Sequence, residues 1–330
     1  MRWQNAKKDI INFNNLPTKK KPILYIRNLY KKYTFKKRPI INGISFDVFK
    51  GQIHAFIGAN GAGKTTTIKS IIGAYSQWSG TVLINGIKNT KAHAKKYLGY
   101  IPEYTNFPKK ITCYKYLFWM ARLSGLGCIE AKFKVKQMLD QYNLTKLAYK
   151  SIASLSSGQK KQILIIQATI HNPDIIIMDE PTTNLDPKAR INFFDLLLKL
   201  KKQNKAIFIS SHNLSELNQY ADSVTILDGG RIIFSGSITK LIKMYQINEY
   251  EVKSSDNKKL ISILKQQKIK YKVSHNFQIL TVNFSNSKKV HAFLQKIKKT
   301  KIILTHFVQK TITLDDIYSK LIKFGSSDTM

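Results

Sequence analysis

Short apolar runs alternate with segments of helical periodicity as far as about residue 240. The runs predict buried strands, with turns expected at Asn42-Gly43 and Lys50-Gly51. Strands are predicted at 23–27, 44–49, 52–57, 80–86, 97–101, 175–178 and 206–210, and helices at 159–170, 188–202 and 214–220. Strands that alternate with helices in this way indicate an α/β fold with a mostly parallel sheet. The runs 224–227 and 231–234 are typical of a β-hairpin.

The block 113–155 has a different pattern, because its apolar residues recur at helical spacing. Tyr116, Leu117, Met120 and Leu123 follow this spacing, and so do Phe133, Val135, Met138 and Leu139. We therefore predict a helical subdomain at about 104–158, inserted into the α/β chain.

The two ends of the chain differ from its middle. Residues 1–22 are polar and basic and are interpreted as a flexible leader, so the main domain is expected at 23–244. Residues 245–330 are expected to form a small accessory α+β domain. Its strands are predicted at 250–253, 271–273 and 279–284, and its helices at 260–267 and 288–298.

The segment from Gly58 to Thr66 matches the phosphate-binding pattern G-x-x-x-x-G-K-[ST], with Gly63, Lys64 and Thr65 at its end. Glycines let successive backbone N–H groups point at one anion. The lysine adds a positive charge for the β- and γ-phosphates, and the threonine hydroxyl suits Mg²⁺. A predicted strand precedes the segment and a helical pattern follows it. The sequence therefore predicts a nucleoside triphosphate site; the alternative is a glycine turn that lysine follows by chance.

A second candidate is the pair Asp179-Glu180, which ends the apolar run 175–178. A buried strand that ends here would place Asp179 near a metal at the phosphate loop and Glu180 where it could polarise a water molecule. The alternative is a strand that ends in an ordinary acidic turn.

Two weaker signals accompany these motifs. The segment 155–159, Leu-Ser-Ser-Gly-Gln, precedes an apolar helix and forms either a second phosphate cradle or a plain serine N-cap. His212 follows the predicted strand 206–210 and could donate to a γ-phosphate oxygen, or it could be an ordinary surface histidine.

The net charge of +36 is extreme for 330 residues and favours an anionic partner, either nucleic acid or a phospholipid surface. The lysines are spread along the whole chain, however, which favours a solvated basic surface over a specific charged site. No apolar run approaches the roughly 18 residues that span a bilayer, and residues 1–10 lack the apolar core of a signal peptide. A cytoplasmic protein is expected. Cys113 and Cys128 are interpreted as ordinary thiols.

The order of these motifs resembles the ATP-binding cassette (ABC) ATPases. Segment 58–66 resembles the Walker A loop, 155–159 the family signature and 175–180 Walker B. Segment 181–187 resembles the D-loop, His212 the switch histidine, and 222–236 the closing hairpin. The resemblance covers about residues 23–240, and it implies a P-loop cassette with a mixed sheet and an inserted helical subdomain.

The resemblance also implies roles for residues. ATP with Mg²⁺ would be the substrate, Glu180 the general base, and His212 and Lys64 its partners at the phosphate, with Tyr33 beside the adenine. The other expected ATP contacts are Gly58, Asn60, Gly61, Ala62, Gly63, Thr65 and Thr66, and the expected metal ligands are Thr65, Glu103 and Asp179. A second cassette would complete the site in trans through Ser156, Ser157, Gly158 and Gln159, and Asp186 would link the two sites.

Two positions depart from the family pattern: Ser157 stands where glycine is usual, and Glu103 where many members have glutamine. The segment 61–67, Leu185-Asp186-Pro187 and the C-terminal segment 313–318 resemble the exporters of drugs, lipids or polysaccharides. The expected function is therefore that of an ATPase subunit that drives a separate membrane permease from the inner face of the membrane. Anionic lipid is a further expected contact. A soluble ABC ATPase that acts on nucleic acid or as a regulator is the alternative.

Overall fold

The computed structural model describes residues 21–34, 38–213, 216–245, 248–274, 279–310 and 314–325. The expected leader therefore lies outside the described residues, apart from Lys21 and Pro22. The chain divides into two compact units, one that extends to Ile238 and a second at Thr239–Leu321. The sequence placed this division after residue 244.

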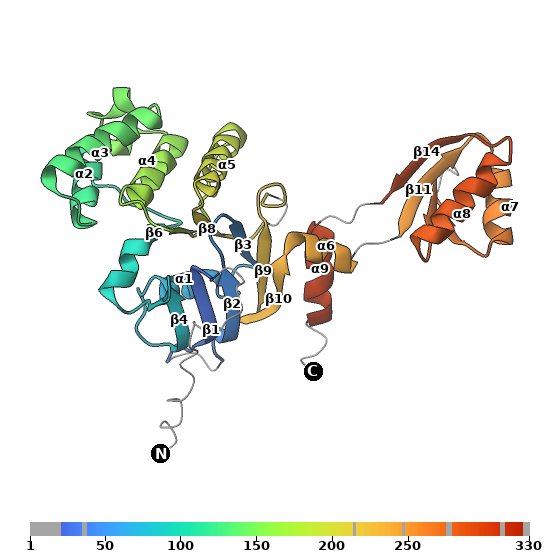
Figure 1. Cartoon of the computed structure of the whole chain (residues 1–330), viewed down its shortest axis with the longest axis horizontal. Helices are drawn as coiled ribbons and strands as arrows, with labels where there is room; N and C mark the ends of the chain where they lie inside the picture. The colour runs from blue at the N-terminus through green and yellow to red at the C-terminus, as the bar shows by residue number, and fades with distance from the viewer. Residues whose placement is uncertain are drawn as a thin grey trace, which may run out of the picture. The chain divides into compact units, whose positions relative to one another are not determined.

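The first unit is built on a six-stranded sheet with the order β10-β9-β3-β8-β7-β6 (Figure 1). Its strands are β3 (Ile53–Gly58), β6 (Leu98–Ile101), β7 (Ile175–Met178), β8 (Ala206–Ser211), β9 (Ser223–Asp228) and β10 (Arg231–Ser237). All neighbouring pairs are parallel except β9 and β10, which form the predicted hairpin. Every residue of β3, β7 and β8 is buried, as expected for a parallel sheet covered on both faces.

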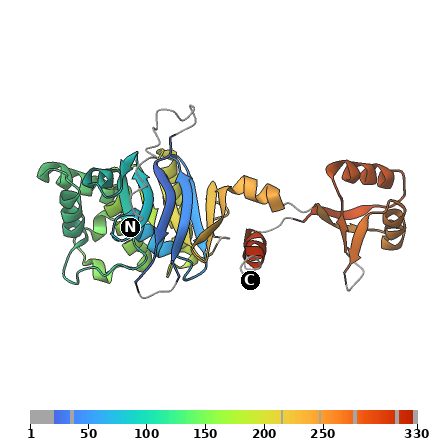
Figure 2. The same ribbon diagram turned by 90° about the horizontal axis from the view of Figure 1, so that it is seen from below.

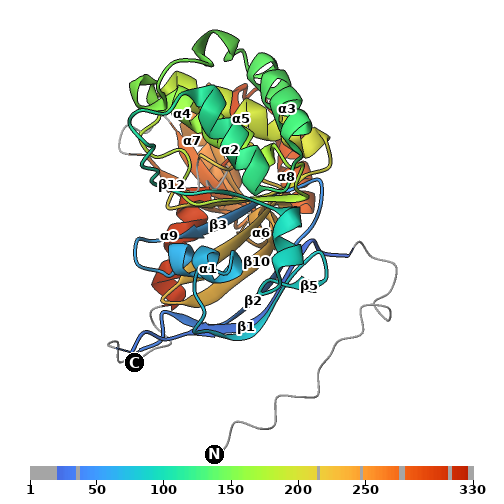
Figure 3. The same ribbon diagram turned by 90° about the vertical axis from the view of Figure 1, so that its left-hand side faces the viewer.

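A smaller antiparallel sheet has the order β2-β1-β4-β5. Its strands are β1 (Leu24–Lys31), β2 (Ile41–Val48), β4 (Ser79–Ile84) and β5 (Ile87–Lys88). Helix α1 (Lys64–Ile71) lies between the two sheets (Figure 3), and its Ile68 shares one core cluster with Ile26 of β1 and Phe56 of β3. Both sheets therefore hold the start of α1 in place.

The turn predicted at Asn42-Gly43 is wrong, because both residues lie inside β2. Leu29 pairs with Ile44 and Tyr30 pairs with Asn42, so Gly43 has no partner across the strands. Gly43 has a φ of 70°, which glycine adopts without strain. The sequence signal for a turn therefore marks a β-bulge.

The inserted helices are α2 (Cys113–Leu123) and α3 (Cys128–Gln141), and α4 (Ser157–Thr169) and α5 (Pro187–Lys202) follow them. Leu117 and Val135 are buried, as the periodicity predicts, but Leu123 and Phe133 are exposed. Short 3₁₀ helices occur at Ala92–Tyr97, Thr145–Leu147 and Ile152–Ser154. Cys113 is buried and Cys128 exposed, each at the start of its helix.

The helix predicted at 214–220 is not found in the part of it that the structure describes. Residues 216–220 form turns, in which the N–H groups of Tyr220 and Ala221 both donate to Leu217 O. Strand β9 begins at Ser223, so too few residues remain to repay the cost of starting a helix. Residues 214 and 215 lie outside the description.

The second unit has the strand–helix order β11-α7-β12-β13-α8-β14 and the sheet order β12-β13-β11-β14, all antiparallel. Figure 2 shows this unit, in orange and red, as a sheet with helices beside it. This is the split βαβ arrangement of ferredoxin-like folds. Its elements are β11 (Glu249–Ser254), α7 (Asn257–Gln266), β12 (Lys270–Val273), β13 (Leu280–Asn283), α8 (Ser287–Lys298) and β14 (Leu304–Gln309). Leu260 of α7 and Phe293 of α8 share a core with Val252 of β11. The remaining helices are α6 (Ile238–Tyr245) and α9 (Leu314–Gly325).

His54 is buried in the middle of the first unit. Its ring packs against Phe46 and Phe208, and the three ring centroids lie 5.7 Å from one another. Its Nδ1 lies 2.8 Å from Ser223 Oγ and its Nε2 lies 2.9 Å from Thr225 Oγ1. Burial lowers the pKa of His54 to about 3.

This histidine predicts a loss of stability in acid. The unfolded chain takes up the proton near pH 6.5 and the folded chain only near pH 3, so His54 contributes stability above pH 6.5 that is lost as the pH falls toward 3. Between pH 7 and 5 we expect a loss of about 2 kcal/mol in the free energy of unfolding. Urea unfolding at both pH values would measure it. The variant His54→Phe should lose less over the same interval, and equal losses would contradict the prediction.

Candidate functional site

The loop that joins β3 to α1 contains the predicted phosphate-binding segment. Gly61 and Gly63 have φ values of 83° and 108°, in the left-handed region that favours glycine. A Cβ on Gly63 would lie 2.7 Å from Ile40 O, so a larger residue would also clash with the backbone just before β2. Helix α1 begins directly after Gly63, and its N–H groups are oriented toward the start of the helix. The local sequence therefore builds an anion-binding turn.

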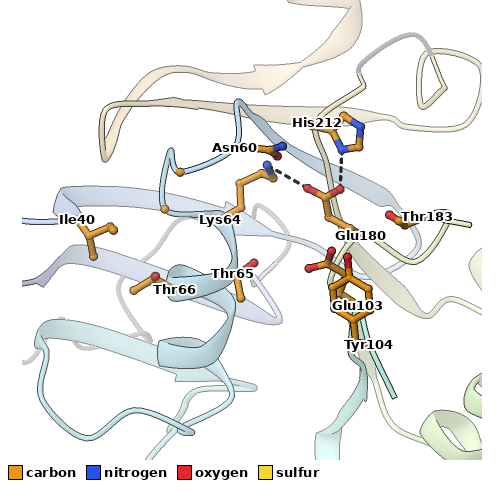
Figure 4. Close-up of a pocket in the computed structure, with 12 residues that line it drawn as sticks. Ile40, Asn60, Lys64, Thr65, Thr66, Glu103, Tyr104, Glu180, Thr183 and His212 are labelled. Atoms are coloured by element: carbon orange, nitrogen blue, oxygen red, sulfur yellow. Dashed lines mark hydrogen bonds and ion pairs between the residues drawn. The ribbon is translucent and has the colours of Figure 1, made fainter. Parts of the chain in front are cut away.

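Lys64 is buried, and its ammonium group is surrounded by oxygen atoms. Nζ donates to Gly58 O at 2.8 Å and to Ala59 O at 3.3 Å, and it forms an ion pair with Glu180 Oε1 at 3.0 Å (Figure 4). The side chain of Lys64 is 5% exposed. The loop carbonyls thus hold the lysine with its charge directed toward the end of β7.

Glu180 connects this lysine to the loop that follows β8. Its Oε2 lies 2.6 Å from His212 Nδ1, and its backbone N–H donates to Ser210 Oγ at 2.9 Å. Burial by itself raises the pKa of Glu180, but hydrogen bonds and charges from His212 and Lys64 outweigh it, so the pKa lies below its usual value. The carboxylate is therefore ionised at neutral pH and has one cationic and one titratable partner.

Asp179 lies beneath the pocket and is 1% exposed. Burial raises its pKa above the usual value, and the charges of Glu103 and Glu180 raise it further, against hydrogen bonds from Ser210 and Thr65. Ser210 Oγ donates to Asp179 Oδ1 at 2.7 Å. The oxygens of Thr65, Glu103 and Asp179 are hard ligands of the kind that Mg²⁺ accepts, and a divalent cation would relieve the repulsion among the carboxylates.

The structure gathers most of the predicted residues around one pocket of about 440 Å³ (Figure 4). The predicted residues that line it are Asn60, Gly61, Gly63, Lys64, Thr65, Thr66, Glu103, Glu180 and His212. Ile40, Tyr104 and Thr183 line it too and were not predicted. Gly58 and Ala62, which were also expected to contact ATP, are not among the lining residues. The pocket combines the Lys64 ammonium group and the start of α1 with the carboxylates of Glu103 and Glu180, which suits a triphosphate with its metal.

Tyr33 is not among the lining residues, but it lies close to them. Its hydroxyl is 3.5 Å from Thr66 Oγ1, and its ring meets the ring of Tyr75 edge-on at 6.1 Å. Lys31 Nζ lies 5.0 Å from the centroid of the Tyr33 ring. An aromatic side chain is thus held beside the end of the phosphate loop, and its contact with adenine stays a prediction.

The signature residues do not join this pocket. Ser156, Gly158 and Gln159 line a second pocket of about 220 Å³, which also includes Asp186. Ser156 caps α4 by accepting from Gln159 N at 3.2 Å, and the Gln159 side chain accepts from Ser156 N in return. Ser157 is the exposed first residue of α4. The N-cap expected for this segment is therefore present, and the segment lines a pocket that does not include Lys64 of its own chain.

Besides the three lining residues that were not predicted, sequence reasoning missed two residues that contact the site. Ser210, the polar end of an apolar strand, bonds both Asp179 and the backbone of Glu180. Lys161 of α4 is buried, and its Nζ donates to Glu103 O at 3.3 Å. The sequence signal for Lys161 was its position beside the apolar run 163–166, because a lysine that is buried there requires partners.

Comparison with known proteins identifies the family. The chain is 39% identical to an ABC transporter ATP-binding protein of Mycoplasma pneumoniae, across 92% of this chain and 93% of that protein. The chain belongs to the ABC transporter ATP-binding proteins. The family model "ABC transporter" matches residues 41–183. The Nod factor export ATP-binding protein I of Burkholderia orbicola is 32% identical, over 66% of this chain and 71% of that protein.

A solved ATP-binding subunit of an ABC transporter superposes with a TM-score of 0.61 and 29% identity, covering 68% of this chain and 93% of that one. The expected α/β cassette fold and ATPase activity are thereby confirmed for this ABC protein. In the part of the chain that the structure describes, no helix has the length and apolar character needed to cross a membrane.

Proposed function

We propose that this ABC ATPase binds ATP between two cassettes and drives export through a separate permease. The observation that supports it is the separation of the two half-sites. The phosphate loop and Glu180 line one pocket, whereas Ser156, Gly158 and Asp186 line another. A second cassette, turned head to tail, would bring its signature residues over the phosphate loop of the first.

Within such a site the residues have distinct tasks. Lys64 and the N–H groups at the start of α1 would neutralise the phosphates. Glu180 would take a proton from the attacking water, and His212 would hold the Glu180 carboxylate in place and contact the γ-phosphate. Mg²⁺, which Thr65, Asp179 and Glu103 would hold, would supply charge neutralisation at the phosphates.

Complementation between two inactive variants tests the shared site. Lys64→Met removes the phosphate-loop charge, and Ser156→Glu places a negative charge in the signature. Each variant alone should lose ATP hydrolysis. A mixed dimer contains one intact site, so an equimolar mixture should regain about a quarter of wild-type activity if chains pair at random. Sites confined to single chains, or a different natural partner, would leave the mixture inactive.

The helical insertion offers a surface for the permease. Leu123, Ile129 and Phe133 are 78%, 86% and 68% exposed, and they gather where α2 ends and α3 begins. A group of large exposed apolar residues marks a contact surface more often than single scattered apolar residues do. Because relatives include a protein named for export of Nod factor, export is the direction that we propose.

Loss of this apolar surface should uncouple the ATPase from its membrane partner. We expect Ile129→Glu/Phe133→Glu to abolish co-purification of a permease from native membranes, because charged side chains would have to be desolvated at the contact. The ATPase rate of the purified variant should stay near that of the wild type. Val308→Glu, at an apolar residue that is 52% exposed in the second unit, is the matched control. Unchanged permease recovery by the double variant would exclude this surface.

The charge of +36 adds a second membrane contact to the proposal. A cytoplasmic ATPase docked at the inner face of the membrane would meet anionic lipids, and each basic residue near that surface contributes about 1 kcal/mol. The alternative of a nucleic-acid ATPase has the charge in its favour but no support among the relatives.

A further inference from the structure

A single carboxylate, that of Glu216, connects three segments around the site. Its Oε2 accepts from Thr182 Oγ1 at 3.0 Å, and its Oε1 accepts from Arg190 Nη1 at 2.8 Å. Asn213 Nδ2 approaches Oε1 at 3.5 Å. The Glu216 side chain is 16% exposed, so these contacts are mostly shielded from water.

Each partner lies close in sequence to a residue of the site. Thr182 follows Glu180 by two residues, and Glu216 follows His212 by four. Arg190 lies one turn into α5, whose N-cap is Asp186, and its Nη2 donates to Leu185 O at 3.4 Å. The hydrogen bond from Thr182 therefore ties the Glu180 loop to the segment that follows His212, and the ion pair with Arg190 ties the start of α5 to it.

The backbone at Glu180 needs such support. Its φ of 41° lies in the left-handed region, which is strained for a residue with a side chain and persists only where the surroundings hold it. Ser210 Oγ bonds Glu180 N from one side. The Thr182–Glu216 hydrogen bond fixes the chain two residues further on.

The chemistry of the pair also favours a role in positioning. The Glu216 side chain is 16% exposed and that of Arg190 37%, so removing the arginine would leave a shielded carboxylate without its cationic partner. Arg190 Nε is buried with no hydrogen-bond partner, which adds cost to placing the arginine here. Apolar residues in place of this ion pair would stabilise the fold equally well. Directional bonds are needed, in contrast, to fix the distance between two segments.

We propose that Glu216 is a positioning residue that, through Thr182 and Arg190, holds the Glu180 and His212 loops at the separation that ATP hydrolysis requires. The same bonds carry the position of Asp186, in the pocket of the signature residues, to the Glu180–His212 contact. This inference rests on the proposed function, because it presumes that Glu180 and His212 act on ATP.

The test is a double-mutant cycle on steady-state ATP turnover by the purified full chain, with single-turnover rate constants measured in addition for the slow variants. Glu216→Gln should lower kcat about 10-fold while KM for ATP changes less than about twofold, since the group acts on the reacting geometry and not on binding. In a His212→Ala background, Glu216→Gln should cause little further loss. Asp47→Asn is the control for losing an ion pair. It breaks the pair between Arg27 and Asp47, whose charged atoms are 2.7 Å apart and which lies away from the site.

If Glu216→Gln does not fold, Thr182 decides the outcome, because Thr182→Ser keeps the hydroxyl and Thr182→Val removes it at similar size. Thr182→Ser should retain turnover and Thr182→Val should lose about threefold in kcat. Equal turnover of these two variants, or a full additional loss from Glu216→Gln in the His212→Ala background, would overturn the proposal. An unmodified chain without turnover would instead count against the proposed function.

Discussion

The variant Glu180→Gln should lose ATP hydrolysis by at least about 100-fold, because general-base catalysis contributes about 10²- to 10⁴-fold and glutamine cannot accept the proton. Glutamine has nearly the same size, so the pocket keeps its shape. Glu180 is also the anionic partner of Lys64 at 3.0 Å and of His212 at 2.6 Å. Removing its charge leaves Lys64 unneutralised, which favours an incoming phosphate.

We therefore expect Glu180→Gln to bind ATP at least as tightly as the wild type and to accumulate as an ATP-bound dimer. Phosphate release would measure the hydrolysis, and light scattering with and without ATP would measure the dimer. Glu130→Gln makes the same chemical change at the exposed first turn of α3 and should leave turnover unchanged. Normal hydrolysis by Glu180→Gln would show that another group is the base.

Lys64→Met should weaken ATP binding by about 10- to 100-fold, because a buried hydrogen bond to a charged group contributes about 1.5–3 kcal/mol. The side chain is 5% exposed, so water does not replace the lost charge. The variant also removes a charge that lowers the pKa of Glu180, so this pKa should rise. Binding and catalysis should consequently both suffer.

Isothermal titration with ATP would measure the affinity of Lys64→Met, and a pH series of the residual rate would show the change at Glu180. The rate contributed by the base should shift toward higher pH, because the carboxyl now holds its proton longer. Lys115→Met, at an exposed lysine of α2, is the matched control. An affinity within about twofold of the wild type would remove Lys64 from the phosphate site.

Much of the fold could be predicted from local patterns. The strands β3, β7 and β8 are short apolar runs, and the phosphate loop has its glycines at fixed spacing, so each is encoded within a few residues. The errors arose where local and tertiary preferences differ. Asn42-Gly43 is a turn signal that pairing with β1 converts into a bulge. Leu123 and Phe133 follow helical spacing, but nothing in the described first unit covers them.

The sequence by itself determined the family and the ATP chemistry and predicted the residues that would carry it, because these depend on residue types at fixed spacing. Tertiary structure decided which of them meet. Lys64, Glu180 and His212 come from three segments that only the order of the parallel strands β3, β7 and β8 brings together. It also placed Ser156 in a separate pocket and joined three segments at Glu216, because contacts between distant segments depend on the packing of the sheet and not on local pattern.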